Sequence, residues 1–230
     1  MKLRPAGLAV VLVSPSVAVF CLLYAALDVP AVLSAFIAFL SAFVWADVWY
    51  FVHIIGTVVA SPPTCLQSVL DSHEYPAIVG LNDIDRNGHF NNARYLRACN
   101  YGRRAFWTAN GIWELLCANG GNLLVGAQTV RYRRELTLGQ SYTLRTRIRT
   151  WDNQAFYIEH QFVMGAEAAG SLFVHAVVLV KNNVMGSKRP QMLMEMRQPG
   201  IVAPPVDPDV QSWIDSNAAS SLMLRPNKNT

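Results

Sequence analysis

Residues 85–95, Asp85-Arg86-Asn87-Gly88-His89-Phe90-Asn91-Asn92-Ala93-Arg94-Tyr95, combine a carboxylate, an amide, a glycine and an imidazole with an Asn-Asn pair. Asn is a preferred N-cap residue, so this pair is expected to start a helix. The first backbone N–H groups of a helix are unpaired and lie at the positive end of its dipole, where they stabilise a developing oxyanion. The stretch therefore predicts a carboxylate beside an anion-stabilising helix N-terminus, an arrangement suited to hydrolysis.

The predicted helix runs from this pair to about Asn110-Gly111, where the glycine ends it. Tyr95, Cys99, Gly102 and Phe106 recur at i, i+4, i+7 and i+11, so they form one buried stripe. Small residues on the helix would let a sheet pack closely against it: Ala98, Cys99, Gly102 and Ala105.

The chain after this helix alternates in the manner of β-strands. Strands are predicted at 123–136, 142–151, 155–164 and 171–181, with turn residues between them. Apolar and polar residues alternate in 142–151, 123–136 is rich in branched residues, and 171–181 is nearly all apolar, as a central strand would be. Consecutive hairpins imply antiparallel pairing, so the domain is predicted to be α+β, with one helix on a meandering antiparallel sheet. Weaker patterns predict a short strand at 78–81, short helices at 65–71 and 112–118, and a C-terminal helix at 209–222.

The first sixty residues are apolar. The ranges 5–27 and 29–46 contain no charged residue, and Asp28 lies between them. The length of each range approaches that of a segment that crosses a bilayer, about 20 residues. Residues 1–60 are therefore predicted to be a membrane anchor with one or two transmembrane helices, and two buried helices of a soluble domain are the alternative. Residues 61–200 are predicted as the globular domain and 201–230 as a tail with a short helix.

The topology follows from how many segments span the membrane. If both span, the domain returns to the side of Lys2 and Arg4, which is the cytosol. If the first is a cleaved signal and the second stops transfer, the domain is again cytosolic. A single signal anchor would place it in the lumen of the secretory pathway. The cytosolic side is the expectation and the lumen is the alternative.

The cysteines and charges exclude several classes of protein. Cys21 lies in the first apolar segment, which leaves three cysteines in the domain, and an odd count without paired spacing argues against a disulfide framework. No Cys/His cluster suggests zinc, so no metal or cofactor is expected. Eleven arginines and no lysine lie from Arg86 to Arg149. Arginine binds phosphate in a bidentate manner, which suits a substrate such as coenzyme A, although a solvated positive face is the alternative. Nucleic acid is not expected as a partner, because the aromatic residues of an RNA-binding sheet are missing.

The motif of residues 83–95 resembles that of hotdog-fold thioesterases of the 4-hydroxybenzoyl-CoA thioesterase-like group. Those proteins carry an Asp-x-Asp pair, a Gly three residues after the second Asp and a Tyr ten after it, here Asp83, Asp85, Gly88 and Tyr95. The run Asp85-x-Asn87-x-His89-x-Asn91-Asn92 is also similar to plant-type acyl-carrier-protein thioesterases. The resemblance implies a hotdog fold, in which an antiparallel sheet wraps around a central helix. It also implies a homodimer or homotetramer and an endoplasmic reticulum membrane.

The resemblance implies roles for three catalytic residues. Asp85 would be the nucleophile or general base at the thioester carbonyl, with Asn87 and His89 acting beside it. The alternatives are an Asx-turn role for Asp85 and a structural role for His89. The plant-type pattern places an acidic residue about thirty-five positions after the His. Leucines occupy that region here, and the nearest acids are Glu114 and Glu135.

Four more residues are expected to bind the substrate. Gly88 would permit close approach of the backbone, and the amides near Asn92 and Ala93 would donate to the oxyanion. Tyr95 would pack in the core with its hydroxyl near the site.

Three functions remain open at this point. The first is a membrane-anchored thioesterase that hydrolyses acyl-CoA to a carboxylic acid and coenzyme A. The second is a non-catalytic module that binds acyl-CoA or lipid and acts as a membrane scaffold. The third, an enoyl-CoA hydratase, is disfavoured, because such enzymes carry an Asp-x-Asn-Pro-x-His run, whereas Asp85 and His89 are four apart and no Pro follows Asn87.

Overall fold

The computed structural model describes residues 5–60, 66–165, 170–186 and 188–224. The chain divides into two compact units, Met1–Pro62 and Pro63–Thr230.

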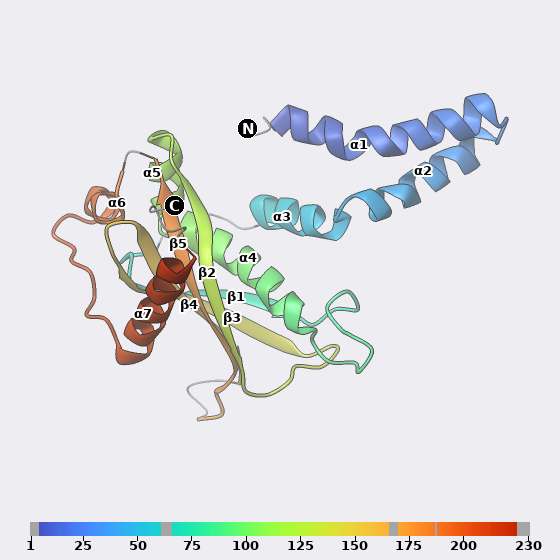
Figure 1. The fold of residues 1–230 in the computed structure, drawn as a ribbon. Helices are drawn as coiled ribbons and strands as arrows, with labels where there is room; N and C mark the ends of the chain where they lie inside the picture. Colours follow the sequence, from blue (N-terminus) through green and yellow to red (C-terminus); the bar gives the residue numbers. More distant parts are fainter. Residues whose placement is uncertain (1–4, 61–65, 166–169, 187, 225–230) are drawn as a thin grey trace. The chain divides into compact units, whose positions relative to one another are not determined.

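The first unit is helical (Figure 1). It contains α1 (Pro5–Cys21), a π-helical turn η1 (Leu22–Ala26), α2 (Ala31–Trp45) and α3 (Val48–Ala60). The hydroxyls of Ser16 on α1 and Ser41 on α2 lie 3.0 Å apart, which joins these two helices. Large apolar side chains are nevertheless exposed along α2: Val32, Phe36, Phe39, Leu40 and Val44.

The first predicted span, 5–27, forms α1 and η1 in succession, and the second, 29–46, forms α2. Among the described residues, no single helix is long and apolar enough to cross a bilayer. The helix pair Ala31–Trp45 and Val48–Gly56 meets the length and composition requirement together but is bent by 87°. The predicted second span thus ends at Trp45, and α3 was not expected as a separate helix.

The second unit is built on a five-stranded antiparallel sheet with the strand order β1-β3-β4-β5-β2. Its strands are β1 (His73–Ile78), β2 (Asn122–Tyr132), β3 (Ser141–Trp151), β4 (Ala155–Met164) and β5 (Phe173–Met185). The α+β class with an antiparallel sheet is confirmed. The meander is confirmed for β3, β4 and β5 only. β2 pairs with β5 rather than with β3, because a turn signal marks where a strand ends and not which strand it joins.

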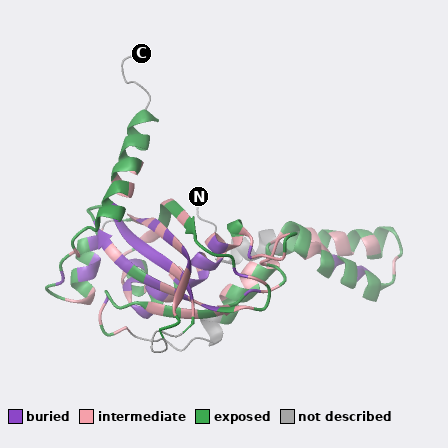
Figure 2. Ribbon diagram, turned by 90° about the horizontal axis from the view of Figure 1, so that it is seen from below, coloured by how far each residue is buried: buried purple, intermediate pink, exposed green. Residues whose placement is uncertain are grey.

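Helix α4 (Asn92–Ala109) packs on this sheet, and its buried side chains join those of the strands in one hydrophobic core (Figure 2). Tyr95, Cys99 and Phe106 are buried as the stripe predicted. At Gly102, a Cβ atom would lie 2.4 Å from Cδ2 of Leu144 on β3. A larger residue at this position would force the buried Leu144 side chain to move, so the glycine favours close packing of the helix on the sheet.

Three further helices complete this unit: α5 (Ile112–Ala118), α6 (Pro190–Arg197) and α7 (Pro208–Met223). The helix predicted at 65–71 is wrong, since its described part, 66–71, forms bends and turns. The strand before the Asp85 loop is His73–Ile78 rather than 78–81. Helix α6 was not predicted, and Arg197 at its end donates to the carbonyls of Asn110 and Leu66.

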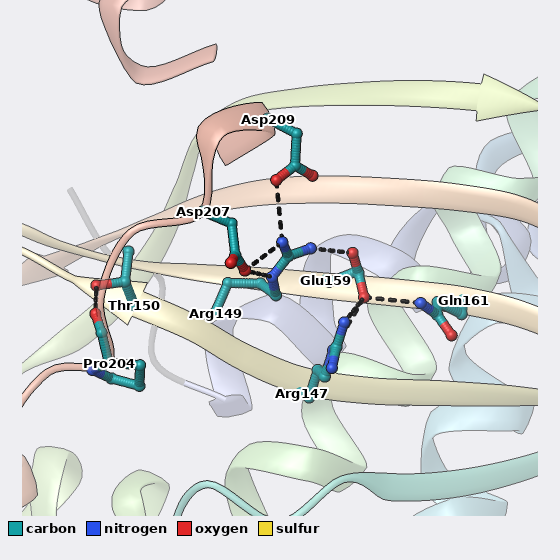
Figure 3. Close-up of polar contacts among 8 residues, drawn as sticks. All are labelled: Arg147, Arg149, Thr150, Glu159, Gln161, Pro204, Asp207 and Asp209. Carbon is teal, nitrogen blue, oxygen red and sulfur yellow. Dashed lines mark hydrogen bonds and ion pairs between the residues drawn. The ribbon is translucent and has the colours of Figure 1, made fainter. Parts of the chain in front are cut away.

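The face of the sheet opposite α4 carries a buried carboxylate (Figure 3). The side chain of Glu159 on β4 is only 5% exposed. Its Oε1 accepts from Arg147 Nε at 3.0 Å and from Gln161 Nε2 at 2.8 Å, and its Oε2 accepts from Arg149. A carboxylate in such a place needs charged partners to offset its loss of hydration, and the alternating arginines of β3 provide them.

Arg149 also fastens the C-terminal segment to this face. Its Nη2 lies 2.6 Å from Asp207 Oδ2 and 3.0 Å from Asp209 Oδ1, both at the start of α7. Thr150 Oγ1 donates to the carbonyl of Pro204 at 2.9 Å. Carboxylates at a helix N-terminus are also favoured by its dipole. The C-terminal segment is therefore held on the sheet through one arginine that bridges three acids.

One buried histidine makes the stability of this unit dependent on pH. His160 is fully buried, and its Nδ1 lies 2.8 Å from Thr146 Oγ1. Burial, with a smaller contribution from Arg103, lowers the pKa of His160 well below its usual 6.5. Below about pH 6.5, His160 is therefore protonated in the unfolded chain but stays neutral in the folded chain.

We expect the free energy of unfolding of residues 63–230 to fall as the pH drops below about 6.5, by up to about 1.4 kcal/mol per pH unit from this group. Urea unfolding at several pH values measures this slope. His160→Asn should remove it, while His89→Asn, at a half-exposed position, should keep it. An unchanged slope in His160→Asn would contradict the assignment.

Candidate functional site

Asp85 opens a tight turn that ends at His89. The Asp85 N–H donates to the His89 carbonyl and the Gly88 N–H to the Asp85 carbonyl, both at 3.0 Å. Asp85 Oδ1 accepts the N–H of Asn87 at 2.8 Å, which is an Asx-turn. Gly88 has φ +77°, a conformation that a residue with a Cβ rarely adopts. The structure therefore brings Asp85, Asn87 and Gly88 together through the backbone of the turn.

The neighbouring carboxylate, Asp83, holds the base of the same loop. Its Oδ2 accepts the N–H of Gly80 at 2.9 Å, and its carbonyl accepts the N–H of Asn91 at 2.7 Å. An isolated bridge pairs Ile84 with Phe90. These bonds close the loop onto the start of α4, so Asp85 is held at the helix entrance by its surroundings on both sides.

The entrance of α4 is capped by Asn91. Its Oδ1 accepts the N–H of Ala93 at 2.9 Å, and its carbonyl accepts the N–H of Arg94 at 2.8 Å. The Ala93 amide, expected as an oxyanion donor, is thus engaged by the cap. Within the described residues, the hydrogen bonds leave the amide of Asn92 without an acceptor. Asn92 is therefore the first-turn amide that can receive an anionic oxygen.

His89 faces an acid that sequence spacing did not assign to it. Its Nδ1 lies 3.7 Å from Oε2 of Glu135, and the two side chains are 40% and 60% exposed. A bridge between His89 and Thr137 holds the two segments together. The imidazole is therefore oriented by Glu135, and it is the backbone carbonyl of His89 that contacts Asp85.

Tyr95 is part of the core beneath the loop. It is 2% exposed, and its ring centroid lies 4.3 Å from that of Phe90, 4.8 Å from Phe162 and 5.1 Å from Tyr132. Burial raises the pKa of Tyr95 to about 12, against the opposing effect of a backbone hydrogen bond with Leu136. Its hydroxyl therefore stays protonated at neutral pH, and the side chain supports the site from below.

Residues 132–137 lie beside the loop of residues 85–91 and form the rim of the site. The hydroxyl of Tyr132 donates to the carbonyl of Asn92 at 2.9 Å, and the N–H of Phe90 donates to the Leu136 carbonyl at 2.7 Å. With the His89–Glu135 contact, these bonds tie residues 132–137 to residues 89–92. Sequence reasoning assigned this segment to a strand and overlooked its part in the site.

Two surface hollows lie elsewhere on the second unit. One, of about 360 Å³, is on the face opposite α4, and its lining includes Arg145, Arg147 and Glu159. The other, of about 460 Å³, lies at the β1 end of the sheet beside Tyr142. Neither is lined by Asp85, Asn87 or His89. In the part of the chain that the structure describes, no group of His, Cys, Asp and Glu side chains converges as metal ligands would.

Comparison with known proteins identifies the family. The sequence model of the protein family described as "Thioesterase-like superfamily" matches residues 79–214, which include the Asp85 loop, α4 and β2 to β5. This chain belongs to the thioesterase-like superfamily. The family and hotdog-like fold predicted from the motif of residues 83–95 are confirmed.

Curated relatives place the chain more closely within this superfamily, among the THEM6 proteins. Protein THEM6 of Danio rerio is 37% identical over 183 residues, which cover 78% of this chain and 87% of the relative. Protein THEM6 of Xenopus laevis is 34% identical over 182 residues, or 78% and 85%. Protein THEM6 of Drosophila melanogaster is 32% identical over 190 residues, or 80% and 94%. The similarity therefore extends over most of both chains.

The cap of α4 can be tested separately from any activity of this THEM6 family member. Asn91→Ala should lower the free energy of unfolding by about 1 kcal/mol, because the Ala93 amide loses its acceptor. Asn92→Ala is the matched control, since its side chain is exposed, and we expect a change of only a few tenths of a kcal/mol. Urea unfolding of residues 63–230 measures both. Equal losses in the two variants would contradict the cap assignment.

Proposed function

We propose that this protein is a membrane-anchored thioesterase that hydrolyses an acyl-CoA thioester to a carboxylic acid and coenzyme A. One observation carries the proposal: the turn of residues 85–89 holds the Asp85 carboxylate at the entrance of α4, where the Asn92 amide has no acceptor among the described residues. A carboxylate and an anion-stabilising amide are the two groups that such a hydrolysis needs.

In the proposed reaction, the thioester oxygen lies against the Asn92 amide, which stabilises the charge that develops there. Asp85 takes a proton from water while the water oxygen bonds to the carbonyl carbon. The C–S bond then breaks, and the departing thiolate takes up a proton. Direct attack by the carboxylate, followed by hydrolysis of the anhydride, uses the same groups.

His89 and Glu135 supply a second titratable pair for this chemistry. The Glu135 carboxylate lies 3.7 Å from Nδ1 of His89 and orients the imidazole. An N–H of this ring at the rim can donate the proton that the leaving thiolate needs. We therefore assign His89 the role of proton donor and Glu135 that of the residue that positions it.

A non-catalytic binding module is the second candidate. The observation that favours it is the Asx-turn, in which Asp85 Oδ1 accepts the N–H of Asn87 and has a structural role without any substrate. Such a module would bind an acyl-CoA or a lipid and hold partners at a membrane. Turnover distinguishes the two candidates.

The membrane part of the proposal is supported by the exposed apolar side chains of α2. A soluble protein rarely leaves so many large apolar side chains together in water. We propose that residues 1–60 anchor the chain in the endoplasmic reticulum membrane with the domain on the cytosolic side. The lumen of the secretory pathway is the alternative.

The free edge of β2 supports a homodimer or a larger homo-oligomer. β2 is an eleven-residue strand at the end of the sheet, with Leu124 and Val125 exposed. Long apolar edges invite pairing with another strand. A second copy placed there would also extend the surface around the rim of residues 132–137, which follows directly on β2.

The catalytic role is tested with Asp85→Asn. Loss of the carboxylate should lower thiol release from acyl-CoA by about 10²–10⁴-fold, while the amide can still accept the Asn87 N–H. Asp83→Asn is the matched control, because that side chain only closes the loop and should retain most of the activity. A panel of short, long and aromatic acyl-CoAs would also give the acyl specificity. Wild-type protein that turns over none of them would leave the binding module as the better function.

The anchor is tested by fractionation. We expect the 230-residue chain to stay in the membrane pellet after alkaline carbonate extraction, and residues 63–230 to move to the supernatant. Protease added to sealed microsomes should digest the domain if it faces the cytosol. A full chain that is extracted by carbonate would contradict the anchor, and a protected domain would indicate the lumen.

A further inference from the structure

Two consecutive arginines, Arg133 and Arg134, lie on the same side of the chain at the end of β2. Successive residues of a strand normally point to opposite faces. Here the N–H groups of both residues donate to one carbonyl, that of His175, at 2.8 and 3.1 Å. Two residues opposite one is the pattern of a β-bulge, which redirects side chains.

The two guanidinium groups share a single aromatic ring. The Cζ of Arg133 lies 5.0 Å and that of Arg134 lies 4.1 Å from the ring centroid of Phe173. Arg133 Nη1 also donates to the carbonyl of Val174 at 3.0 Å. Cation–π contact with a ring does not use the N–H donors of a guanidinium, so these remain able to bind an anion. The arginines are held in place before any ligand arrives.

Within the described residues, neither guanidinium forms an ion pair with a carboxylate, whereas Arg145, Arg147 and Arg149 of β3 do. The acid next in the chain, Glu135, is directed to His89 instead. Two adjacent positive charges in exposed positions, without a carboxylate, favour the binding of an anion.

The position of this pair connects it to the candidate catalytic loop. Tyr132, which precedes the arginines, contacts Asn92, and Glu135, which follows them, contacts His89. The pair therefore lies on the rim of the loop that contains Asp85. An anion bound there would belong to a molecule that also reaches the loop.

We propose that Arg133 and Arg134, held by Phe173, form a phosphate-binding site for the nucleotide end of the substrate. Guanidinium groups bind phosphate oxygens through paired, charge-assisted hydrogen bonds. Coenzyme A carries a pyrophosphate and a 3′-phosphate, so it offers anionic groups for both arginines. The identification of this ligand as coenzyme A depends on the proposed function, whereas the phosphate chemistry depends on the arginines alone.

The experiment measures binding of free coenzyme A to the 230-residue chain in nonionic detergent by calorimetry. Charged hydrogen bonds of this kind correspond to about tenfold in affinity for each arginine, so Arg133→Gln with Arg134→Gln should weaken binding by about 100-fold. Arg104→Gln, an exposed arginine on α4, is the matched control and should bind like the wild type. Equal binding by the wild type and the double variant, or no binding by the wild type, would overturn the proposal.

A second pair of substrates separates this site from catalysis. With acyl-CoA, the double variant should show a KM raised by about 100-fold. With the corresponding acyl-pantetheine, which has the same thioester and no phosphate, it should match the wild type. An equal loss with both substrates would mean that the substitutions damage the loop, and the phosphate site would be refuted. Arginine-dependent binding of coenzyme A without any turnover would sustain this site and remove the thioesterase proposal.

A lipid headgroup presents the same phosphate chemistry and is distinguished by competition. We expect detergent micelles that contain phosphatidic acid to leave coenzyme A bound to the wild type. Arginine-dependent displacement of coenzyme A by these micelles at low lipid content would instead assign the pair to a membrane surface and overturn the nucleotide site.

Discussion

The close approach of α4 to β3 at Gly102 is the constraint on which the second unit depends. Because a Cβ here would lie 2.4 Å from the Leu144 side chain, any larger residue would displace that buried side chain or push the helix away from the sheet. The position of the helix axis then fixes its first turn, where Asn91 Oδ1 accepts the Ala93 N–H and the Asp83 carbonyl accepts the Asn91 N–H. A shift of the helix away from the sheet would move Asn92 and the Asp85 loop together. The site therefore inherits its geometry from a contact that lies well inside the helix.

The two faces of the sheet differ in chemistry: one is packed with apolar side chains and the other carries charged ones. The face toward α4 is closed by apolar side chains and by neutral His160, whereas the opposite face buries Glu159 among arginines. A buried ion pair adds little net stability, because the loss of hydration offsets most of the attraction. What it does provide is position, since the one Arg149 side chain contacts Glu159, Asp207 and Asp209 together. This explains why the C-terminal segment is held at the start of α7 while only Val210 of that helix is buried.

Much of the second unit could be predicted from the sequence, because its signals are local. The Asn cap, the spacing of Tyr95, Cys99 and Phe106, and the closing glycine define α4 within a residue or two. The period-two alternation similarly locates β3 and β4. The neighbour of β2 could not be predicted in this way, since pairing with β5 depends on contacts across about fifty residues. In the first unit, uniform apolarity carries no period, and the break before α3 is marked only by Asp47, whose Oδ1 accepts the N–H of Tyr50.

In the candidate site too, the contacts between residues close in the sequence could be predicted, and the long-range contacts could not. Asp85, Asn87 and Gly88 are close in the sequence, and a turn motif is enough to bring them together. The contact between His89 and Glu135 arises only because residues 132–137 pair with the loop, and a search at fixed spacing from His89 passes over that acid. The bulge at Arg133 and Arg134 is equally hidden, since it is created by the carbonyl of His175 on another strand. A run of basic residues on an alternating strand indicates a solvated face. It becomes a paired anion-binding surface only when the partner strand supplies one acceptor for two amides and a phenyl ring for two guanidinium groups.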